Sequence, residues 1–381
     1  MCEPRYSIYS WRYETLYIAN NHRLRQCNAQ STICWEVETP LFLENCWYVA
    51  ARGEDIGRHL TPRKLLKRNV VLYRLENGAV AALDDACPHR RLPLSKGQLL
   101  GDQIECGYHG LQFDCSGRCV AAPTQSRIPP NAVVKSYPTI ERWGFVWIWM
   151  GERDRADESH LPDIPNYSNP DWGKTEGGTL DIRCNYLWLT DNLLDPSHVA
   201  WVHKTSFAAP GADKTELELR TFDDGLIVSR WIKNQSVPPY YASLVKFQGK
   251  CDRLQHYEVR LPSTCINRSI FTPAGSGGEE DSEHVDQAYV MISYNFMTPV
   301  DDDNSAYYWF QHYNTDPDNE AVAKQLNQGA IAAFNEDREI LEAVHVGMRD
   351  QLTPNINLGL DAGAVRFREL MKRSIAAEQK D

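Results

Sequence analysis

The sequence contains no run of apolar residues long enough to cross a bilayer. Its most hydrophobic stretch, Gly144 to Met150, is short and is typical of a buried strand. Positive charge is also scarce, because the formal net charge is −11 and no long basic cluster occurs. Binding to nucleic acid requires clustered Lys and Arg to neutralise phosphates. The sequence therefore predicts neither a membrane protein nor a nucleic-acid-binding protein.

Two further features are missing, a secretion signal and a dense framework of cysteines. The first residues lack the apolar core and small-residue cleavage site of an exported protein. The 11 cysteines are odd in number and scattered through 381 residues. We therefore expect a cytoplasmic protein, in which clustered Cys and His bind metal more often than they form disulfides.

The chain divides into an extension and two expected domains. Residues 1–40 show no clean periodicity and are predicted to be a poorly ordered extension. Residues 41–150 predict a small all-β domain, with strands at 70–75 and 79–83 around Asn77-Gly78, a strong hairpin signal. Residues 151–381 predict a second domain. It begins with a Pro- and Asp-rich linker over 151–170, and contains strands at 226–231, 288–295 and 307–312 and a helix over 319–348.

Cysteine and histidine occur together twice, in Cys87-Pro88-His89 and in Cys106-Gly107-Tyr108-His109. Two Cys and two His fit zinc, but zinc fingers usually group Cys with Cys and His with His. One residue of each type on each of two loops suits two adjacent irons, one bound by both thiolates and the other by both imidazoles. That is the arrangement of a Rieske [2Fe–2S] cluster. A structural zinc knuckle is the alternative.

The two motifs, extended to Arg90 and Gly110, resemble the cluster motif of the Rieske non-haem iron oxygenases. The resemblance implies that Cys87, His89, Cys106 and His109 bind one [2Fe–2S] cluster. It also implies an α+β fold, in which an all-β Rieske domain precedes a larger catalytic domain. In that domain an antiparallel sheet is flanked by helices in a helix-grip (Bet v1-like) arrangement.

An oxygenase also needs an iron with open positions, commonly held by two His and one carboxylate. His198 and His203 are candidates, but residues five apart on a regular helix point in clearly different directions. Convergence on one metal therefore requires a distortion or a helix end, and Pro196 is consistent with such an interruption. Taken alone, two histidines at this spacing are more often ordinary surface or core residues.

A carboxylate falls on the apolar face of the predicted helix over 319–348. This face recurs at three- and four-residue steps and consists of Ala330, Ala333, Phe334, Ile340, Leu341 and Val344. Asp337 lies on it, whereas Glu336, Arg338 and Glu339 are expected to point away. A buried carboxylate is costly without a partner, and a metal would be one. A salt bridge at the edge of the face is the alternative.

The pattern Asp195-x-x-His198-x4-His203, with a helical Asp337 far downstream, is similar to the iron-binding pattern of Rieske oxygenases. The resemblance implies that His198, His203 and Asp337 bind one mononuclear Fe(II). It implies that Asp195 bridges His198 to the partner subunit's His109 and gives electrons a short path between the two metals. The alternative role for Asp195 is a helix N-cap, with Pro196 in the first helical position.

The resemblance covers residues 41–370, with the segments 45–51, 141–149 and 361–363 most similar to the oxygenase components of vanillate O-demethylase, dicamba O-demethylase and toluenesulfonate methyl-monooxygenase. Leu111 stands where many ring-dihydroxylating subunits carry Trp, which favours this branch. The family further implies a homotrimer that receives electrons from a reductase containing flavin and an iron–sulfur centre. That reductase oxidises NADH or NADPH.

The implied reaction uses O2 to hydroxylate or O-demethylate a substituted aromatic compound, with an aromatic acid favoured. A hydroxylated methoxy carbon is a hemiacetal, which releases formaldehyde. Asn267 and Asn295 align loosely with substrate-pocket positions of the relatives, and ordinary polar residues of a loop or strand are the alternative for both. The alternative functions are a ring cis-dihydroxylating dioxygenase and a non-catalytic Rieske or zinc protein.

Overall fold

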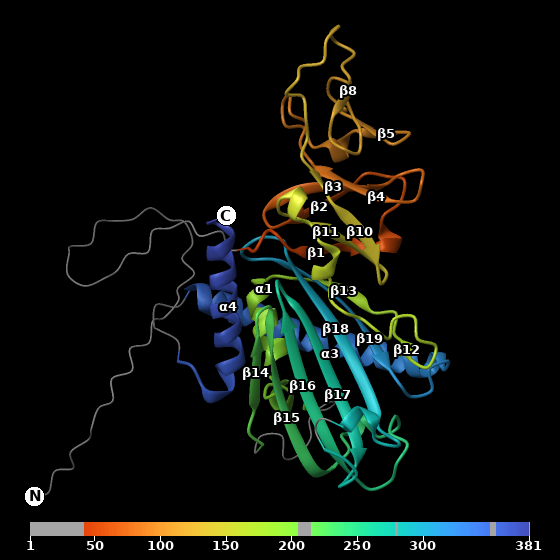
Figure 1. Ribbon diagram of the computed structural model, residues 1–381, viewed down its shortest axis with the longest axis vertical. Coiled ribbons are helices and arrows are strands. Elements are labelled where there is room, and N and C mark those ends of the chain that lie inside the picture. Colours follow the sequence, from red (N-terminus) through yellow and green to blue (C-terminus); the bar gives the residue numbers. More distant parts are fainter. Residues whose placement is uncertain (1–41, 205–214, 279–280, 351–355, 381) are drawn as a thin grey trace, which may run out of the picture.

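The structure is a computed structural model that describes residues 42–204, 215–278, 281–350 and 356–380. The predicted extension over residues 1–40 lies outside these ranges. An all-β part stands above a larger part built on a single long sheet (Figure 1). Among the described residues no helix is both long enough and apolar enough to span a bilayer.

The upper part consists of three small antiparallel sheets. The first contains β1 (Trp47–Arg52), β11 (Phe145–Trp149) and β10 (Thr139–Arg142). The second contains β2 (Thr61–Leu65), β3 (Arg68–Arg74), β4 (Val80–Asp84) and β9 (Ser136–Tyr137). The third contains β5 (Gln98–Leu100), β6 (Gln103–Glu105), β7 (Gln112–Phe113) and β8 (Cys119–Ala121). The predicted hairpin is confirmed as β3 and β4, and its turn contains Gly78 at a φ of 89°, which glycine adopts without strain.

The lower part is an antiparallel sheet in the order β12-β19-β18-β17-β16-β15-β14, with β13 also paired to β19. Its strands are β12 (Gly173–Lys174), β13 (Gly178–Ile182), β14 (Glu218–Phe222), β15 (Gly225–Ser236), β16 (Lys250–Arg260), β17 (Thr264–Pro273), β18 (Tyr289–Pro299) and β19 (Ser305–Tyr313). The strands predicted at 226–231, 288–295 and 307–312 are confirmed within β15, β18 and β19.

Helices cover one face of this sheet. They are α1 (Tyr186–Leu194), α2 (Val199–Val202), α3 (Glu320–Asp350) and α4 (Ala362–Glu378). The predicted helix over 319–348 is confirmed as α3, and α1 contacts β16, β17 and β18. Leu226, Val228 and Val259 of the sheet share one core with Phe334 of α3 and Phe367 of α4. The predicted α+β fold with helices on an antiparallel sheet is therefore confirmed.

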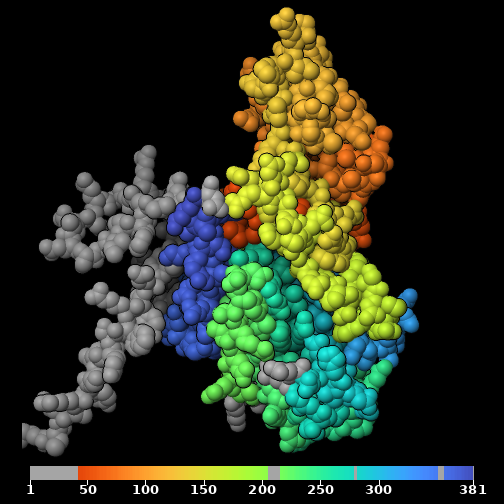
Figure 2. All heavy atoms as spheres, in the orientation of Figure 1, coloured from red at the N-terminus to blue at the C-terminus, as the bar shows by residue number. Residues whose placement is uncertain are grey.

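The segment over residues 151–170, which was predicted to be a linker, is a packed connection. It contains two 3-10 turns, Arg153–Arg155 and Glu158–His160, and lies across both parts of the molecule (yellow-green in Figure 2). The indole nitrogens of Trp47 and Trp149 donate hydrogen bonds to its carbonyls at 2.8 and 2.9 Å, and Ile164 is buried. The boundary between residues 150 and 151 stays a prediction.

A second contact joins the far end of the chain to the upper part. The carboxylate of Glu378, at the end of α4, accepts hydrogen bonds from the amides of Glu44 and Asn45 at 2.8 and 2.5 Å. These two residues lie just before β1, separated from it by Cys46. The last helix of the described chain therefore holds the start of its first strand.

Candidate metal centres

The two Cys/His loops have the same pattern of main-chain hydrogen bonds. In each loop the Cys amide donates a hydrogen bond to the carbonyl five residues later, and the amide four residues later donates to the Cys carbonyl. This amide belongs to Arg91 in the Cys87 loop and to Gly110 in the Cys106 loop. Both residues have left-handed φ values, 60° and 73°. Two such matched loops hold two pairs of side chains in equivalent positions.

The side chains of these loops separate into an inner and an outer pair. Cys87 and Cys106 are buried, whereas His89 is exposed and His109 is half-buried. The Nδ1 atoms of His89 and His109 lie 3.1 Å apart, close enough to share one metal. Burial raises the pKa of the Cys87 thiol, and a hydrogen bond with Cys106 raises it further, so the two thiols are adjacent. Two sulfurs inside and two imidazole nitrogens outside fit a Rieske cluster.

The surroundings of His109 favour the neutral form of its imidazole. Loss of hydration lowers its pKa, and the neighbouring His89 and Arg90 lower it further. Neutral imidazole is the form that binds a metal. The local charge therefore favours the ligand state of this ring.

Asp85, two residues before Cys87, closes the first loop. It is 6 % exposed, and its two carboxylate oxygens accept hydrogen bonds from the amide and the hydroxyl of Ser95, both at 2.6 Å. Sequence reasoning missed this residue, because an aspartate beside a cysteine motif carries no distinctive spacing. Its contacts tie the loop that holds Cys87 and His89 to the turn that follows.

The second centre begins where α1 ends. Helix α1 stops at Leu194, Pro196 follows, and α2 is a single turn over Val199–Val202. His198 and His203 lie at either end of that turn rather than inside a regular helix. The distortion expected from their five-residue spacing is therefore confirmed, and it lets both rings face the same point.

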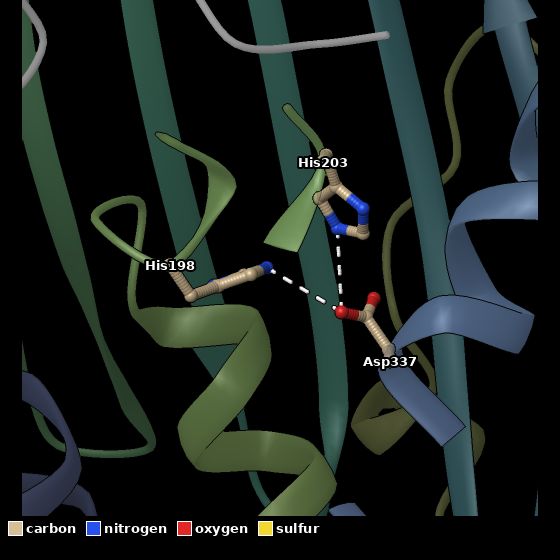
Figure 3. A group of neighbouring side chains, drawn as sticks. All are labelled: His198, His203 and Asp337. Carbon is tan, nitrogen blue, oxygen red and sulfur yellow. Dashed lines mark ion pairs between the residues drawn. The ribbon is translucent and has the colours of Figure 1, made fainter. Parts of the chain in front are cut away.

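Asp337 of α3 completes a compact group with these two histidines (Figure 3). Its Oδ1 atom lies 3.3 Å from Nε2 of His203 and 3.7 Å from Nε2 of His198. One ligand atom from each of the three residues lies within 4.8 Å of the others. Asp337 is 6 % exposed, and this oxygen has no hydrogen-bond partner among the described residues. A buried, unsatisfied carboxylate oxygen facing two imidazole nitrogens fits a metal ion bound by two His and one Asp.

Three side chains of α3 differ from the sequence prediction in their exposure or direction. Ile340 and Val344 are 46 % and 40 % exposed, so the apolar face is narrower than predicted. Glu336 does not point away from the site, because its Oε2 atom accepts a hydrogen bond from Nδ1 of His203 at 2.7 Å. Burial alone would lower the pKa of His203, but the Asp337 and Glu336 carboxylates outweigh it and the pKa is raised.

Asp195 contacts the site through its main chain. Its carbonyl oxygen accepts a hydrogen bond from Nδ1 of His198 at 2.5 Å, and its carboxylate accepts one from the amide of Ser197 at 2.7 Å. Because α2 begins at Val199 and its N-cap is His198, Pro196 does not occupy a first helical position. Asp195 nevertheless makes a hydrogen bond of the N-cap type, to the amide two residues later. The resemblance implies that the carboxylate of Asp195 contacts His198. Within the subunit the main-chain carbonyl of Asp195 makes this contact instead.

The two asparagines predicted for the pocket have different surroundings. Asn267 of β17 donates a hydrogen bond to the carbonyl of Leu193 at 2.9 Å, and its buried Oδ1 has no partner among the described residues. Asn295 of β18 is fully buried. Its Nδ2 donates to two main-chain carbonyls, and its Oδ1 accepts from Ser293 and Tyr307. Of the two asparagines, only Asn267 keeps a polar atom without a partner among the described residues.

Known proteins match both parts of the chain. Residues 46–138 match the Rieske [2Fe-2S] domain, and residues 182–377 match the vanillate O-demethylase oxygenase C-terminal domain. The iron–sulfur subunit of the toluene-4-sulfonate monooxygenase system of Comamonas testosteroni is 38% identical over 344 residues, or 89% of this chain and 98% of that protein. A vanillate O-demethylase oxygenase subunit from a Pseudomonas species is 32% identical over 89% of this chain and 97% of that protein.

Solved structures agree with the sequence matches. Dicamba monooxygenase bound to 3,6-dichlorosalicylic acid is similar with a TM-score of 0.81 and 28% identity, over 89% of this chain and 99% of that chain. The same enzyme has been solved with non-haem iron. A Rieske domain, a buried His–His–Asp group and these relatives show one [2Fe–2S] cluster and one mononuclear iron per chain as the cofactors. The chain belongs to the Rieske non-haem iron oxygenases of the vanillate O-demethylase type, a family of oxidoreductases.

Proposed function

We propose that this protein is the oxygenase component of a multicomponent monooxygenase that hydroxylates or O-demethylates a substituted aromatic compound. The observation that carries the proposal is the convergence of His198, His203 and Asp337 in a chain that also holds two Cys/His loops. When bound, a Rieske cluster supplies single electrons and a mononuclear iron activates O2.

In this proposal each ligand set belongs to one centre. Cys87, Cys106, His89 and His109 hold the cluster, and His198, His203 and Asp337 hold the iron. The chain prepares the iron site by directing Nδ1 of both histidines to fixed oxygen acceptors, which leaves Nε2 of each ring to face Asp337. A hydrogen bond at one ring nitrogen fixes the tautomer that binds metal through the other.

We further propose that the working form is a homotrimer in which Asp195 accepts a hydrogen bond from the partner subunit's His109. Two observations support this bridge. Tyr108, beside His109, is 59 % exposed, so this edge of the cluster domain is accessible to a second subunit. Among the described residues the Asp195 carboxylate makes one hydrogen bond, through Oδ1, and its other oxygen can accept a second one.

The electron donor is proposed to be a reductase with flavin and an iron–sulfur centre that oxidises NADH or NADPH. Local charge supports an acidic docking partner for the cluster domain. Residues 86–135 contain six Lys and Arg but three Asp and Glu, although the whole chain has a net charge of −11. Arg90, Arg91 and Lys96 are exposed beside the cluster loops, where they would attract a negatively charged donor.

The substrate is proposed to be an aromatic acid that places a polar group against Asn267. The relatives named above act on toluene-4-sulfonate and vanillate, or are solved with a chlorinated salicylic acid. Asn267 is bonded to Leu193, one residue before the end of α1, and so lies close to the loop that carries His198. The satisfied hydrogen bonds of Asn295 support a role in holding the sheet together.

The function is tested by NADH-driven turnover with a surrogate reductase on methoxylated, methylated and unsubstituted aromatic acids. Release of formaldehyde or of a benzylic alcohol is expected. Formation of a cis-diol would establish a dioxygenase instead, and iron analysis that finds no mononuclear iron would support a non-catalytic protein.

The bridge is tested with Asp195→Asn. The amide of Asn keeps one acceptor oxygen, which the Ser197 amide uses, but replaces the second acceptor with an NH2 donor. We therefore expect turnover to fall by about 10- to 100-fold while both metal centres remain loaded. Turnover that survives in a fully loaded Asp195→Asn protein would show that the bridge is wrong.

A further inference from the structure

We propose that Glu336 is a positioning residue for the mononuclear iron, because its carboxylate orients and polarises the ring of His203. The proposal rests on the proposed function only in taking His198, His203 and Asp337 as the iron ligands. Glu336 itself would not touch the metal. It would act through the histidine that does.

The geometry places one imidazole between two consecutive residues of α3. Oε2 of Glu336 lies 2.7 Å from Nδ1 of His203, and Oδ1 of Asp337 lies 3.3 Å from Nε2 of the same ring. An ionised carboxylate can only accept a hydrogen bond, so Nδ1 carries a proton, and in the neutral ring that binds metal Nε2 presents its lone pair. The ring is 4 % exposed and has little room to turn away from this orientation. The tautomer that binds metal through Nε2 is therefore set by Glu336.

The two histidines differ in the charge of their acceptors. Nδ1 of His198 donates to the main-chain carbonyl of Asp195, which is neutral, whereas Nδ1 of His203 donates to a carboxylate. A charged acceptor makes the stronger hydrogen bond and raises the basicity of the imidazole that it contacts. His203 is therefore the stronger electron donor of the pair. Because the acceptor of His198 is main chain, Glu336 is the one acceptor of the two that a side-chain substitution can remove.

The position of Glu336 on α3 also couples the ligands to each other. Asp337 is its immediate neighbour, so one helix supplies both the carboxylate ligand and the group that aims His203. A shift of α3 that withdrew Asp337 would break the hydrogen bond to His203 as well. The half-exposed side chain of Glu336 and its bond to a buried ring distinguish it from an ordinary surface acid.

The experiment compares Glu336→Ala and Glu336→Gln with Glu339→Ala in the full-length protein. Glu339 is a matched control, because it lies on the same helix, has the same charge and is exposed. Affinity for Fe(II) is measured by competition with a chelator after the mononuclear iron is removed, with the visible absorption of the cluster as an internal check on folding. The electronic spectrum of Co(II) bound in place of iron reports the ligand field directly.

We expect Glu336→Ala to weaken Fe(II) binding by about 10- to 100-fold, as loss of such an acceptor commonly does, with Glu339→Ala unchanged. Glu336→Gln keeps an oxygen that accepts from Nδ1, so its affinity should stay within about threefold of the original, while loss of the charge shifts the Co(II) bands. Unchanged binding in Glu336→Ala, equal losses in the control, or a Glu336→Gln protein with an unshifted Co(II) spectrum would each overturn the proposal. None of these readouts requires turnover, so a failure of the proposed function would be seen separately.

Discussion

His312 is a buried histidine that neither metal centre uses. It lies on β19, is fully buried, and contacts the rings of Tyr167, Tyr294 and Phe310. Neither of its ring nitrogens has a hydrogen-bond partner among the described residues. Burial lowers its pKa to about 4, and the nearby Lys174 contributes to the shift. The folded protein therefore holds this ring neutral at neutral pH.

The shift predicts how stability depends on pH. An unfolded histidine has a pKa of about 6.5, so the unfolded chain takes up a proton at His312 before the folded protein does. Stability is thus fully present above pH 6.5 and falls as the pH decreases toward 4. One pKa unit corresponds to about 1.4 kcal/mol. The loss from His312 is therefore about 2 kcal/mol between pH 7 and pH 5, and about 3 kcal/mol by pH 4.

The substitution His312→Phe tests this reasoning, because phenylalanine keeps a flat ring and cannot be protonated. Urea unfolding is measured at pH 7, 6 and 5 for the original protein, for His312→Phe and for His59→Phe, whose side chain is exposed. We expect His312→Phe to lose about 2 kcal/mol less than the original between pH 7 and pH 5, and His59→Phe to behave like the original. Parallel losses in all three proteins would refute a neutral, unpartnered His312.

Two further predictions concern the asparagines and the cluster loop. Asn295→Ala should lower the free energy of unfolding by about 2 kcal/mol or more, because it leaves several buried groups without partners. Asn267→Ala removes a single hydrogen bond, so it should cost only about 1 kcal/mol and should raise KM for the substrate. The reverse pattern would exchange their roles. Asp85→Ala should reduce the visible absorption of the cluster per chain, whereas Fe(II) binding at the mononuclear site should be kept. An unchanged cluster spectrum would show that the contacts of Asp85 with Ser95 are dispensable.

Local signals in the sequence were sufficient for much of the fold. The Asn77-Gly78 turn predicts the β3–β4 hairpin, and the three- and four-residue spacing around Phe334 predicts α3. The order of the large sheet was not predictable, since β12 and β13 both pair with β19, more than a hundred residues later. The composition of the segment over residues 151–170 predicts a linker but not its packing, which depends on hydrogen bonds from the indole rings of Trp47 and Trp149 to its carbonyls.

The residues of the iron site likewise divide into those that the sequence predicts and those that it does not. Residue type and spacing made His198, His203 and Asp337 candidates, the resemblance to Rieske oxygenases selected them as a set, and the structure brings them together. Glu336 was missed because its angular position on the helix indicates an outward direction, yet a long side chain at the margin reaches back to a buried ring. The acceptor of His198 could not be predicted at all, because it is a main-chain carbonyl and every residue has one.

The hydrogen bonds from Glu44 and Asn45 to Glu378 also affect the order of events during biosynthesis. The donors and the acceptor are 334 and 333 residues apart, so at ribosomal rates of about 5–20 residues per second the start of β1 waits roughly 20–70 s for its acceptor. The cluster loops have been synthesised long before then. Strand β1 can pair with β11 as soon as residues 145–149 have been made. Only the amides of Glu44 and Asn45 wait for the end of α4, which contacts them after most of the chain has been synthesised.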